Sequence, residues 1–180
     1  GIVHFSPIPR FISRHPRTAP YISAMMTTPD FSPTYHARLR DKTPLAENIW
    51  RLRFARPEPT VTGLRNWDFR AGQYTHIQAA DGTTRAYSIA SGPQHDYIDL
   101  HIRDTGHGMS HALIHDDSHR DITLSAAQGQ GLPEAALSRP LVLIAGGVGI
   151  APVASLLDAA AAFHTPPHLY WGAETAADLY

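Results

Sequence analysis

The feature that most constrains the fold is a run of glycines that directly follows a continuously apolar segment. Residues Leu141–Ala145 are all apolar, and Gly146–Gly149 supplies three glycines. An uninterrupted apolar run is typical of a strand in a parallel sheet. Pro152 then stands where the first turn of a helix tolerates proline. Apolar residues recur at the helical positions i, i+3, i+4 and i+7, namely Val153, Leu156, Leu157 and Ala160. With a second strand at His168–Gly172, the segment predicts a right-handed βαβ unit.

The residues before about 139 follow a different pattern, in which apolar and polar residues alternate over short stretches. This alternation predicts strands at Trp50–Phe54, Gln73–Ala79, Thr84–Ala90, Ile98–Ile102 and Ile122–Ala126. Asp81-Gly82 is a hairpin turn signal, and Ser110–His115 predicts one short helix. Several short strands separated by turns favour a small antiparallel barrel. Trp50 and Trp67 are expected to be packing residues rather than ligand contacts.

Composition excludes several classes of protein. The chain has no cysteine, so it offers no thiolate zinc site, no cysteine nucleophile and no cysteine-ligated iron–sulfur cluster. A net charge of −1 argues against a nucleic-acid binder, and the longest apolar run is about half of a membrane span. We therefore expect a cytoplasmic protein without nucleic-acid or membrane partners.

Residues 1–34 are rich in proline and poor in acidic residues, and we expect them to be a poorly ordered leader or a non-native extension.

Three motifs carry residue types that suit the binding of a nucleotide cofactor. Glycines in Gly147-x-Gly149-x-x-Pro152, between a strand and a helix, let backbone N–H groups approach a phosphate. The alternative is a tight turn that requires glycine. In Arg85-Ala86-Tyr87-Ser88, arginine can hold a phosphate, tyrosine can stack on a flat ring and serine can hydrogen-bond a ring heteroatom. The alternative is an ordinary amphipathic strand.

The third motif is Gly106-His107-Gly108-Met109-Ser110. Its glycines could admit a second phosphate group, and Ser110 is a plausible N-cap of the predicted helix. The alternative is a simple capped loop without a ligand.

The order of these motifs resembles that of a known family. The resemblance is carried by Phe69–Tyr74, Arg85–Ala90, Gly108–Ser110, Leu141–Pro152, Leu169–Ala173 and Asp178–Tyr180. Residues 35–180 resemble the ferredoxin–NADP reductase-like flavoprotein superfamily, and in particular the reductase components of oxygenases. The resemblance implies a six-stranded antiparallel flavin-binding barrel at 35–137. A partial NAD(P)-binding α/β domain, the first βαβ unit of a parallel sheet, follows at 138–180. We expect the chain to be a C-terminally truncated fragment of a longer reductase.

The resemblance also implies roles for individual residues. Arg85 would pair with the flavin phosphate, and Tyr87 would pack on the isoalloxazine or hold the ribityl chain. Ser88 would direct its hydroxyl to flavin N5, where hydride arrives, so Tyr87 and Ser88 are the expected catalytic residues. The remaining cofactor-binding residues are expected to be Ala86, Gly108, Met109 and Ser110 for the flavin, and Gly147, Gly149, Pro152 and Glu174 for NAD(P)H. His101 is also expected to bind a cofactor.

Cofactor and partner preferences follow from the same residues. Glu174 would repel a 2′-phosphate and accept hydrogen bonds from ribose hydroxyls, which favours NADH over NADPH. The Gly108–Ser110 motif suits a pyrophosphate, which favours FAD over FMN. The resemblance implies electron transfer to an iron–sulfur protein or oxygenase. Because this sequence lacks cysteine, the iron–sulfur centre is expected to lie on another chain or in a missing segment. The alternatives are a free-flavin reductase and a flavin-binding module without turnover.

Four histidines are spaced by four residues, namely His107, His111, His115 and His119. On one long helix this spacing would form a metal-binding stripe. Glycines precede the predicted helix and Asp116-Asp117-Ser118 ends it, so that only His111 and His115 are expected to share a helical face. From the histidines alone we predict no functional metal.

Overall fold

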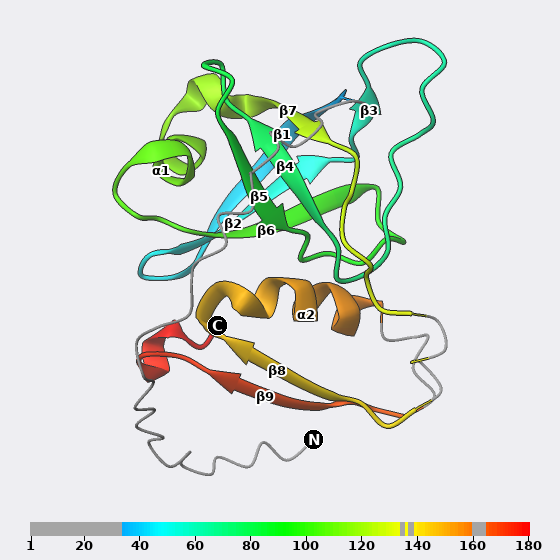
Figure 1. The fold of residues 1–180 in the computed structure, drawn as a ribbon. Helices are drawn as coiled ribbons and strands as arrows, with labels where there is room; N and C mark the ends of the chain where they lie inside the picture. Colours follow the sequence, from blue (N-terminus) through cyan, green and yellow to red (C-terminus); the bar gives the residue numbers. More distant parts are fainter. Residues whose placement is uncertain (1–33, 134–135, 137–138, 160–164) are drawn as a thin grey trace, which may run out of the picture. The chain divides into compact units, whose positions relative to one another are not determined.

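The computed structural model describes residues 34–133, 136, 139–159 and 165–180, and the expected leader before Thr34 lies outside them. The strands and helices, with short 3₁₀ segments labelled η, occur in the following order (Figure 1): β1 (Thr34–Ala46), β2 (Ile49–Ala55), β3 (Glu58–Pro59), β4 (Tyr74–Gln78), β5 (Thr84–Ser88), β6 (Tyr97–Arg103), α1 (Gly108–His115), η1 (Asp117–Arg120), β7 (Asp121–Ser125), β8 (Val142–Gly146), η3 (Gly147–Gly149), α2 (Ile150–Asp158), β9 (His168–Gly172) and η5 (Ala176–Asp178).

The first sheet is antiparallel throughout and runs in the order β5-β4-β7-β1-β2-β6, with β3 paired to β1. An isolated bridge between Ile89 and Leu100 joins its two ends, where Ala90 N–H also donates to Asp99 O at 2.7 Å. The predicted six-stranded antiparallel architecture is therefore confirmed. A bridge rather than a ladder links the ends, so the sheet is not closed into a complete barrel.

The longest strand, β1, is one that sequence periodicity did not predict. It pairs with β2, β3 and β7, which makes it the centre of the sheet. The register to β2 shifts between Leu39 and Asp41 and again between Pro44 and Ala46. Such irregularities bend a strand and increase its twist, which lets one segment pair with different neighbours along its length.

The core lies on the inner face of this sheet. In the β2–β6 ladder, Leu52 faces Leu100 and Phe54 faces Ile98, and all four side chains are fully buried. Trp67 is also buried, and its indole N–H donates to Ser125 O at 3.1 Å. Burying each such side chain contributes about 1.5–3 kcal/mol. Trp67 belongs to this core cluster and the partly buried Trp50 packs against it, so both are packing residues as predicted.

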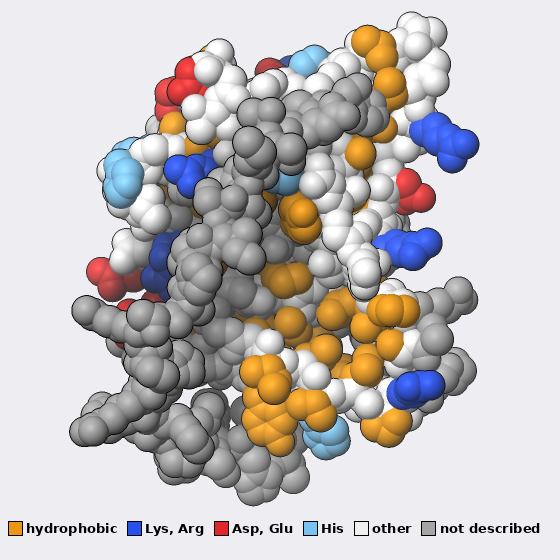
Figure 2. Space-filling model, viewed as in Figure 1, with side chains coloured by type: hydrophobic (Ala, Val, Ile, Leu, Met, Phe, Trp, Pro, Cys, Tyr) orange, Lys and Arg blue, Asp and Glu red, His pale blue; other side chains and the backbone are white. Residues whose placement is uncertain are grey.

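The second sheet is the predicted βαβ unit, with β8 parallel to β9. Leu143 on one face is buried together with Ile150 and Val153 of α2. On the other face, Ile144 is 77% exposed and Tyr170 is 59% exposed. Figure 2 shows hydrophobic side chains gathered over this part of the molecule. Among the described residues, the apolar strand β8 is therefore covered by α2 on one face only. Ala160, predicted as part of the helix, lies outside them.

Side chains of α2 bind loops of the antiparallel sheet, and α2 lies between the two sheets in Figure 1. The buried Ser155 hydroxyl donates to Ser91 O at 2.6 Å. The Asp158 carboxylate accepts the Gly92 N–H at 2.8 Å and lies 2.8 Å from His95 Nε2. These bonds hold the C-terminal half of α2 against loops of the first sheet.

Candidate functional site

The Arg85–Ser88 motif forms most of β5, at the edge of the antiparallel sheet. β4 pairs with it on one side, where Ser88 faces Tyr74 and Arg85 faces Ile77. Arg85 is exposed, and no side-chain hydrogen bond or ion pair engages Arg85 or Ser88 within the part of the chain that the structure describes. Their polar groups are therefore available to a ligand.

Two of the predicted motifs meet at Tyr87. Its hydroxyl lies 3.3 Å from the Ser110 Oγ, although the two residues are 23 positions apart in the sequence. Burial raises the pKa of the Tyr87 hydroxyl, while the hydrogen bond to Ser110 opposes this shift. The phenol therefore stays neutral and can donate or accept a hydrogen bond beside β5.

The loop between β6 and α1 differs from the prediction in one respect. The helix begins at Gly108 and its N-cap is His107, which makes no side-chain capping bond. Ser110 therefore lies inside the first turn, and its prediction as N-cap was wrong. Gly106 and Gly108 have φ values of +74° and +66°, a conformation that favours glycine. They redirect the chain so that the helix starts early and Ser110 is directed to Tyr87.

The same two glycines leave room for a ligand. A Cβ atom placed on Gly106 or Gly108 would meet no atom within 4 Å. Both residues are exposed, as is His107 between them. Met109 is only partly exposed and packs against the core cluster. The loop thus combines exposed backbone with an anchored side chain.

The glycine turn before α2 is oriented by residues outside the predicted motifs. Gly147 has a φ of +49°, and its carbonyl accepts the Trp171 indole N–H at 3.0 Å. The Arg103 Nη2 would lie 3.5 Å from a Cβ on Gly147, whereas Gly149 borders open space. Pro152 lies in the first turn of α2, as predicted. Arg103, the last residue of β6, thus places a positive charge beside this turn.

His101 lies against the C-terminal segment. Its Nδ1 is 3.2 Å from the Tyr180 hydroxyl, and the two rings meet edge to face. Burial lowers the pKa of His101 to about 4, whereas burial raises the pKa of Tyr180 to about 12. Both rings are therefore neutral at pH 7. A cofactor-binding role for His101 stays a prediction, and its partner Tyr180 was not predicted.

The lowered pKa of His101 predicts an acid-dependent loss of stability. Between pH 6.5 and about 4 the unfolded chain binds a proton that the folded chain does not, so the free energy of unfolding falls as the pH falls. The effect is at most about 3 kcal/mol, reduced by solvent screening because the ring is only partly buried. Urea unfolding at pH 7 and 4.5 should show a smaller difference for His101→Gln. The exposed-site control His168→Gln should retain the full difference, and equal differences for all three proteins would contradict the assignment.

Glu174 is exposed and lies two residues after the end of β9. The following turn is held by a capping box, in which Thr175 Oγ1 donates to the Asp178 carboxylate at 2.9 Å. Glu174 therefore directly precedes a turn that is held by hydrogen bonds.

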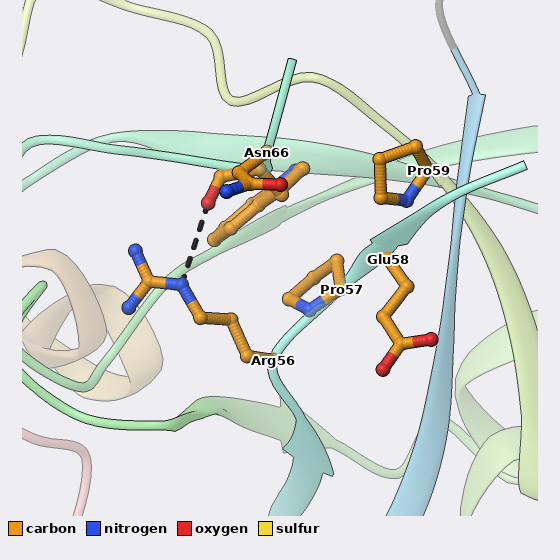
Figure 3. A pocket seen from close by; sticks show the side chains of 6 residues that line it. Arg56, Pro57, Glu58, Pro59 and Asn66 are labelled. Carbon is orange, nitrogen blue, oxygen red and sulfur yellow. Dashed lines mark hydrogen bonds between the residues drawn. The ribbon is translucent and has the colours of Figure 1, made fainter. Parts of the chain in front are cut away.

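A separate pocket of about 230 Å³ is lined by Arg56, Pro57, Glu58, Pro59, Asn66 and Trp67 (Figure 3). The Arg56 guanidinium donates to Trp67 O at 3.4 Å and to His95 O at 2.8 Å. Arg56 thus ties loops of the first sheet together. None of the predicted site residues lines this pocket, which we regard as structural.

Comparison with known proteins adds two family matches. Residues 36–130 match the model of the oxidoreductase FAD-binding domain, and residues 143–180 match that of the oxidoreductase NAD-binding domain. No helix in the described residues is both long and apolar enough to cross a membrane.

Several similar proteins are named as flavin reductases or as reductase components of dioxygenases. An NAD(P)H-flavin reductase of Vibrio harveyi is 33% identical over 159 residues, which cover 82% of this chain and 63% of that protein. Reductase component 2 of the terephthalate 1,2-dioxygenase of Comamonas sp. is 33% identical over 158 residues, covering 84% of this chain and 45% of that protein. The chain thus spans less than two thirds of the length of these relatives.

Solved structures agree with this fold. The Amycolatopsis cytochrome P450 reductase GcoB superposes with a TM-score of 0.67 at 26% identity, over 82% of this chain and 45% of that one. Phthalate dioxygenase reductase superposes with a TM-score of 0.65 over 81% of this chain and 45% of that one. Its identity is 21%, and this likeness supports the fold alone.

Proposed function

The chain belongs to the ferredoxin–NADP reductase-like flavoprotein family, and from this premise we propose that it passes a hydride from NAD(P)H to bound FAD. The observation that carries the proposal is the meeting of the β5 motif with the β6–α1 loop at the Tyr87–Ser110 hydrogen bond. We further propose that residues 35–137 are the flavin-binding domain and residues 138–180 the partial nucleotide-binding domain.

The residues present fit a flavin nucleotide. β5 is an edge strand with an exposed arginine, and Gly106 and Gly108 border open space into which a pyrophosphate could fit. Beside β5, the Nδ1 of His76 is buried without a hydrogen-bond partner among the described residues, and His76 is paired with Ala86 of the motif. An unpaired buried polar atom of this kind is costly unless a partner satisfies it.

When bound, FAD would supply the hydride-accepting ring and would release electrons singly or in pairs. In this proposal Arg85 pairs with the flavin phosphate, while Gly108, Met109 and Ser110 offer N–H groups and a hydroxyl to the pyrophosphate. Tyr87 would pack on the isoalloxazine or hold the ribityl chain, and Ser88 would direct its hydroxyl to N5. Gly147, Gly149 and Pro152 form the surface on which the nicotinamide nucleotide lies, with Arg103 as a nearby positive charge.

For the electron acceptor we propose an iron–sulfur protein or oxygenase partner. The names of the dioxygenase reductase components among the relatives support this choice. Because this sequence has no cysteine, a cysteine-ligated cluster has to lie outside it. The second candidate is a free-flavin reductase, favoured by the similar NAD(P)H-flavin reductase of Vibrio harveyi. A desalting column separates the two, because a free-flavin reductase loses its flavin there and the proposed electron-transfer protein retains it.

The proposal is tested by a visible spectrum of the FAD-reconstituted chain before and after anaerobic NADH addition. Bleaching of bound flavin by NADH supports the reductase. Flavin that is bleached by dithionite but not by NADH contradicts it and supports the flavin-binding module. No flavin binding at all overturns both readings.

Glu174 provides a test of nucleotide preference. Glu174→Arg replaces a charge that repels the 2′-phosphate with one that binds it, so the ratio of kcat/KM for NADPH to that for NADH should rise about tenfold or more. The matched control is Glu58→Arg, which makes the same substitution at an exposed residue of β3 and should leave the ratio unchanged. An unchanged ratio, with flavin binding intact, would remove Glu174 from the nucleotide site.

A further inference from the structure

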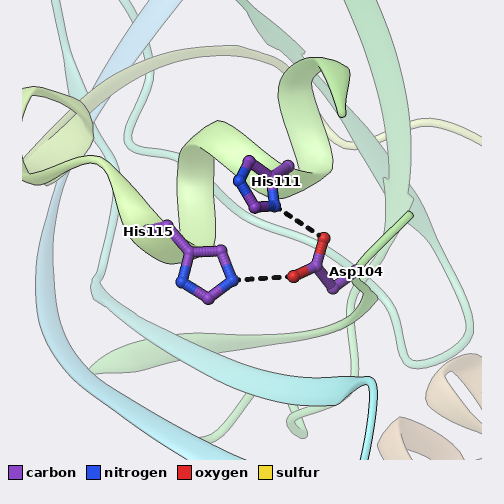
Figure 4. Close-up of side chains that lie close together, drawn as sticks. All are labelled: Asp104, His111 and His115. Carbon is purple, nitrogen blue, oxygen red and sulfur yellow. Dashed lines mark hydrogen bonds and ion pairs between the residues drawn. The ribbon is translucent and has the colours of Figure 1, made fainter. Parts of the chain in front are cut away.

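Three metal-binding side chains converge beside the β6–α1 loop (Figure 4). The Asp104 carboxylate, just after β6, lies 2.9 Å from His111 Nδ1 through one oxygen and 2.7 Å from His115 Nε2 through the other. The three ligand atoms all lie within 4.8 Å of one another. Ligands held about 2 Å from one ion stand roughly 3–4 Å apart, so small rotations of these side chains admit an ion.

Two of the three side chains, those of Asp104 and His115, have a neighbour outside the cluster that orients them. Asp104 accepts the Gly106 N–H at 2.8 Å. This bond and the two histidines lower the pKa of Asp104 to about 2. The His115 ring packs edge to face against Trp50 at 6.0 Å between centroids. Partners of this kind raise metal affinity because they fix the orientation of the ligands before the ion arrives.

The site is open to ions from solvent. The side chains of His111 and His115 are 44% and 46% exposed, whereas that of Asp104 is 15% exposed. Two imidazoles and one carboxylate suit zinc and other late first-row divalent metals better than magnesium or calcium, which prefer oxygen ligands. Three protein ligands also leave a coordination position for water or another group.

We propose that Asp104, His111 and His115 form a binding site for zinc or another late first-row divalent metal ion. The site joins the end of β6 to α1 and so closes the loop that contains Gly106 and Gly108. The sequence prediction of no metal considered the histidines alone. It rightly paired His111 with His115 but omitted Asp104, which is seven residues before His111 and is brought to it by the glycine loop.

The test is a calorimetric titration of zinc chloride into the full chain in chelator-free buffer. We expect one tight site per chain in the wild type. Asp104→Asn, His111→Gln and His115→Gln should each weaken it at least about tenfold. Asp104→Asn keeps an oxygen for the Gly106 N–H, and the two histidines are partly exposed, so the fold should persist and circular dichroism can verify it.

The controls are His107→Gln and His119→Gln, which change neighbouring histidines outside the cluster. Both should bind zinc as the wild type does. Cobalt(II) gives a second readout, because an ordered site with nitrogen and oxygen ligands produces visible absorption bands that the three ligand variants should lose. Zinc binding that is equal in all variants, or reduced equally by the controls, would show adventitious binding to surface histidines and overturn the proposal.

Discussion

Replacing Ser88 with alanine is expected to slow the reduction of bound FAD by NADH about 100-fold, the effect of removing one hydrogen-bond donor aimed at the reacting atom. Ser88 is the last residue of β5 and pairs in backbone register with Tyr74, and its hydroxyl makes no hydrogen bond among the described residues. Flavin affinity should change little, because the phosphate and stacking contacts remain. The measurement is the rate of absorbance loss at the flavin band after anaerobic mixing in a stopped-flow instrument.

The matched control for this variant is Ser118→Ala, an exposed serine of η1 away from β5. Its rate should equal that of the wild type. If Ser88→Ala binds FAD and is reduced at the wild-type rate, the assignment of its hydroxyl to N5 is wrong. A wild-type chain that binds FAD but is not reduced by NADH would instead contradict the proposed function itself.

Arg85→Ala should weaken FAD binding about 10- to 100-fold, since a hydrogen bond to a charged group contributes about 1.5–3 kcal/mol. The guanidinium is exposed on the edge strand, so its removal leaves the fold intact. Arg85→Lys should be intermediate, because lysine keeps the charge but loses the planar fork that binds phosphate through two bonds. Quenching of flavin fluorescence on titration measures the dissociation constants.

Arg65→Ala is the control for this series, because Arg65 is also exposed. Within the described ranges, its backbone carbonyl accepts a hydrogen bond from the Tyr35 hydroxyl and its side chain makes none. The control should bind FAD normally. Equal affinity of Arg85→Ala and the control would remove the phosphate role and leave the β5 motif as an amphipathic strand.

Strand periodicity predicted most of the fold because the burial of these strands follows their sequence alternation. β2 and β6 are the clearest cases, and the βαβ unit was found from its glycine turn. β1 was missed because charged residues and Pro44 interrupt its pattern beyond Leu39. Its position is determined by pairing with three other strands, which no local pattern reveals.

The candidate site was predictable only where its residues are close in sequence. The Arg85–Ser88 and Gly147–Pro152 motifs could be identified locally. Three features depend on contacts between distant segments: the Tyr87–Ser110 bond, the position of Arg103 beside Gly147, and Tyr180 against His101. Ser110 was assigned as a cap because serine favours that position, whereas the positive φ values of two glycines determined where α1 begins.

The bonds from α2 to the loops of the first sheet also bear on how the chain folds. A pair of strands alone is at best marginally stable in water, and β8 and β9 are covered on one face by α2. The Ser155 bond to Ser91 and the Asp158 bond to Gly92 therefore make the βαβ segment depend on a completed antiparallel sheet. The chain should melt in one cooperative transition, and the parallel pair should acquire protection from hydrogen exchange last during refolding.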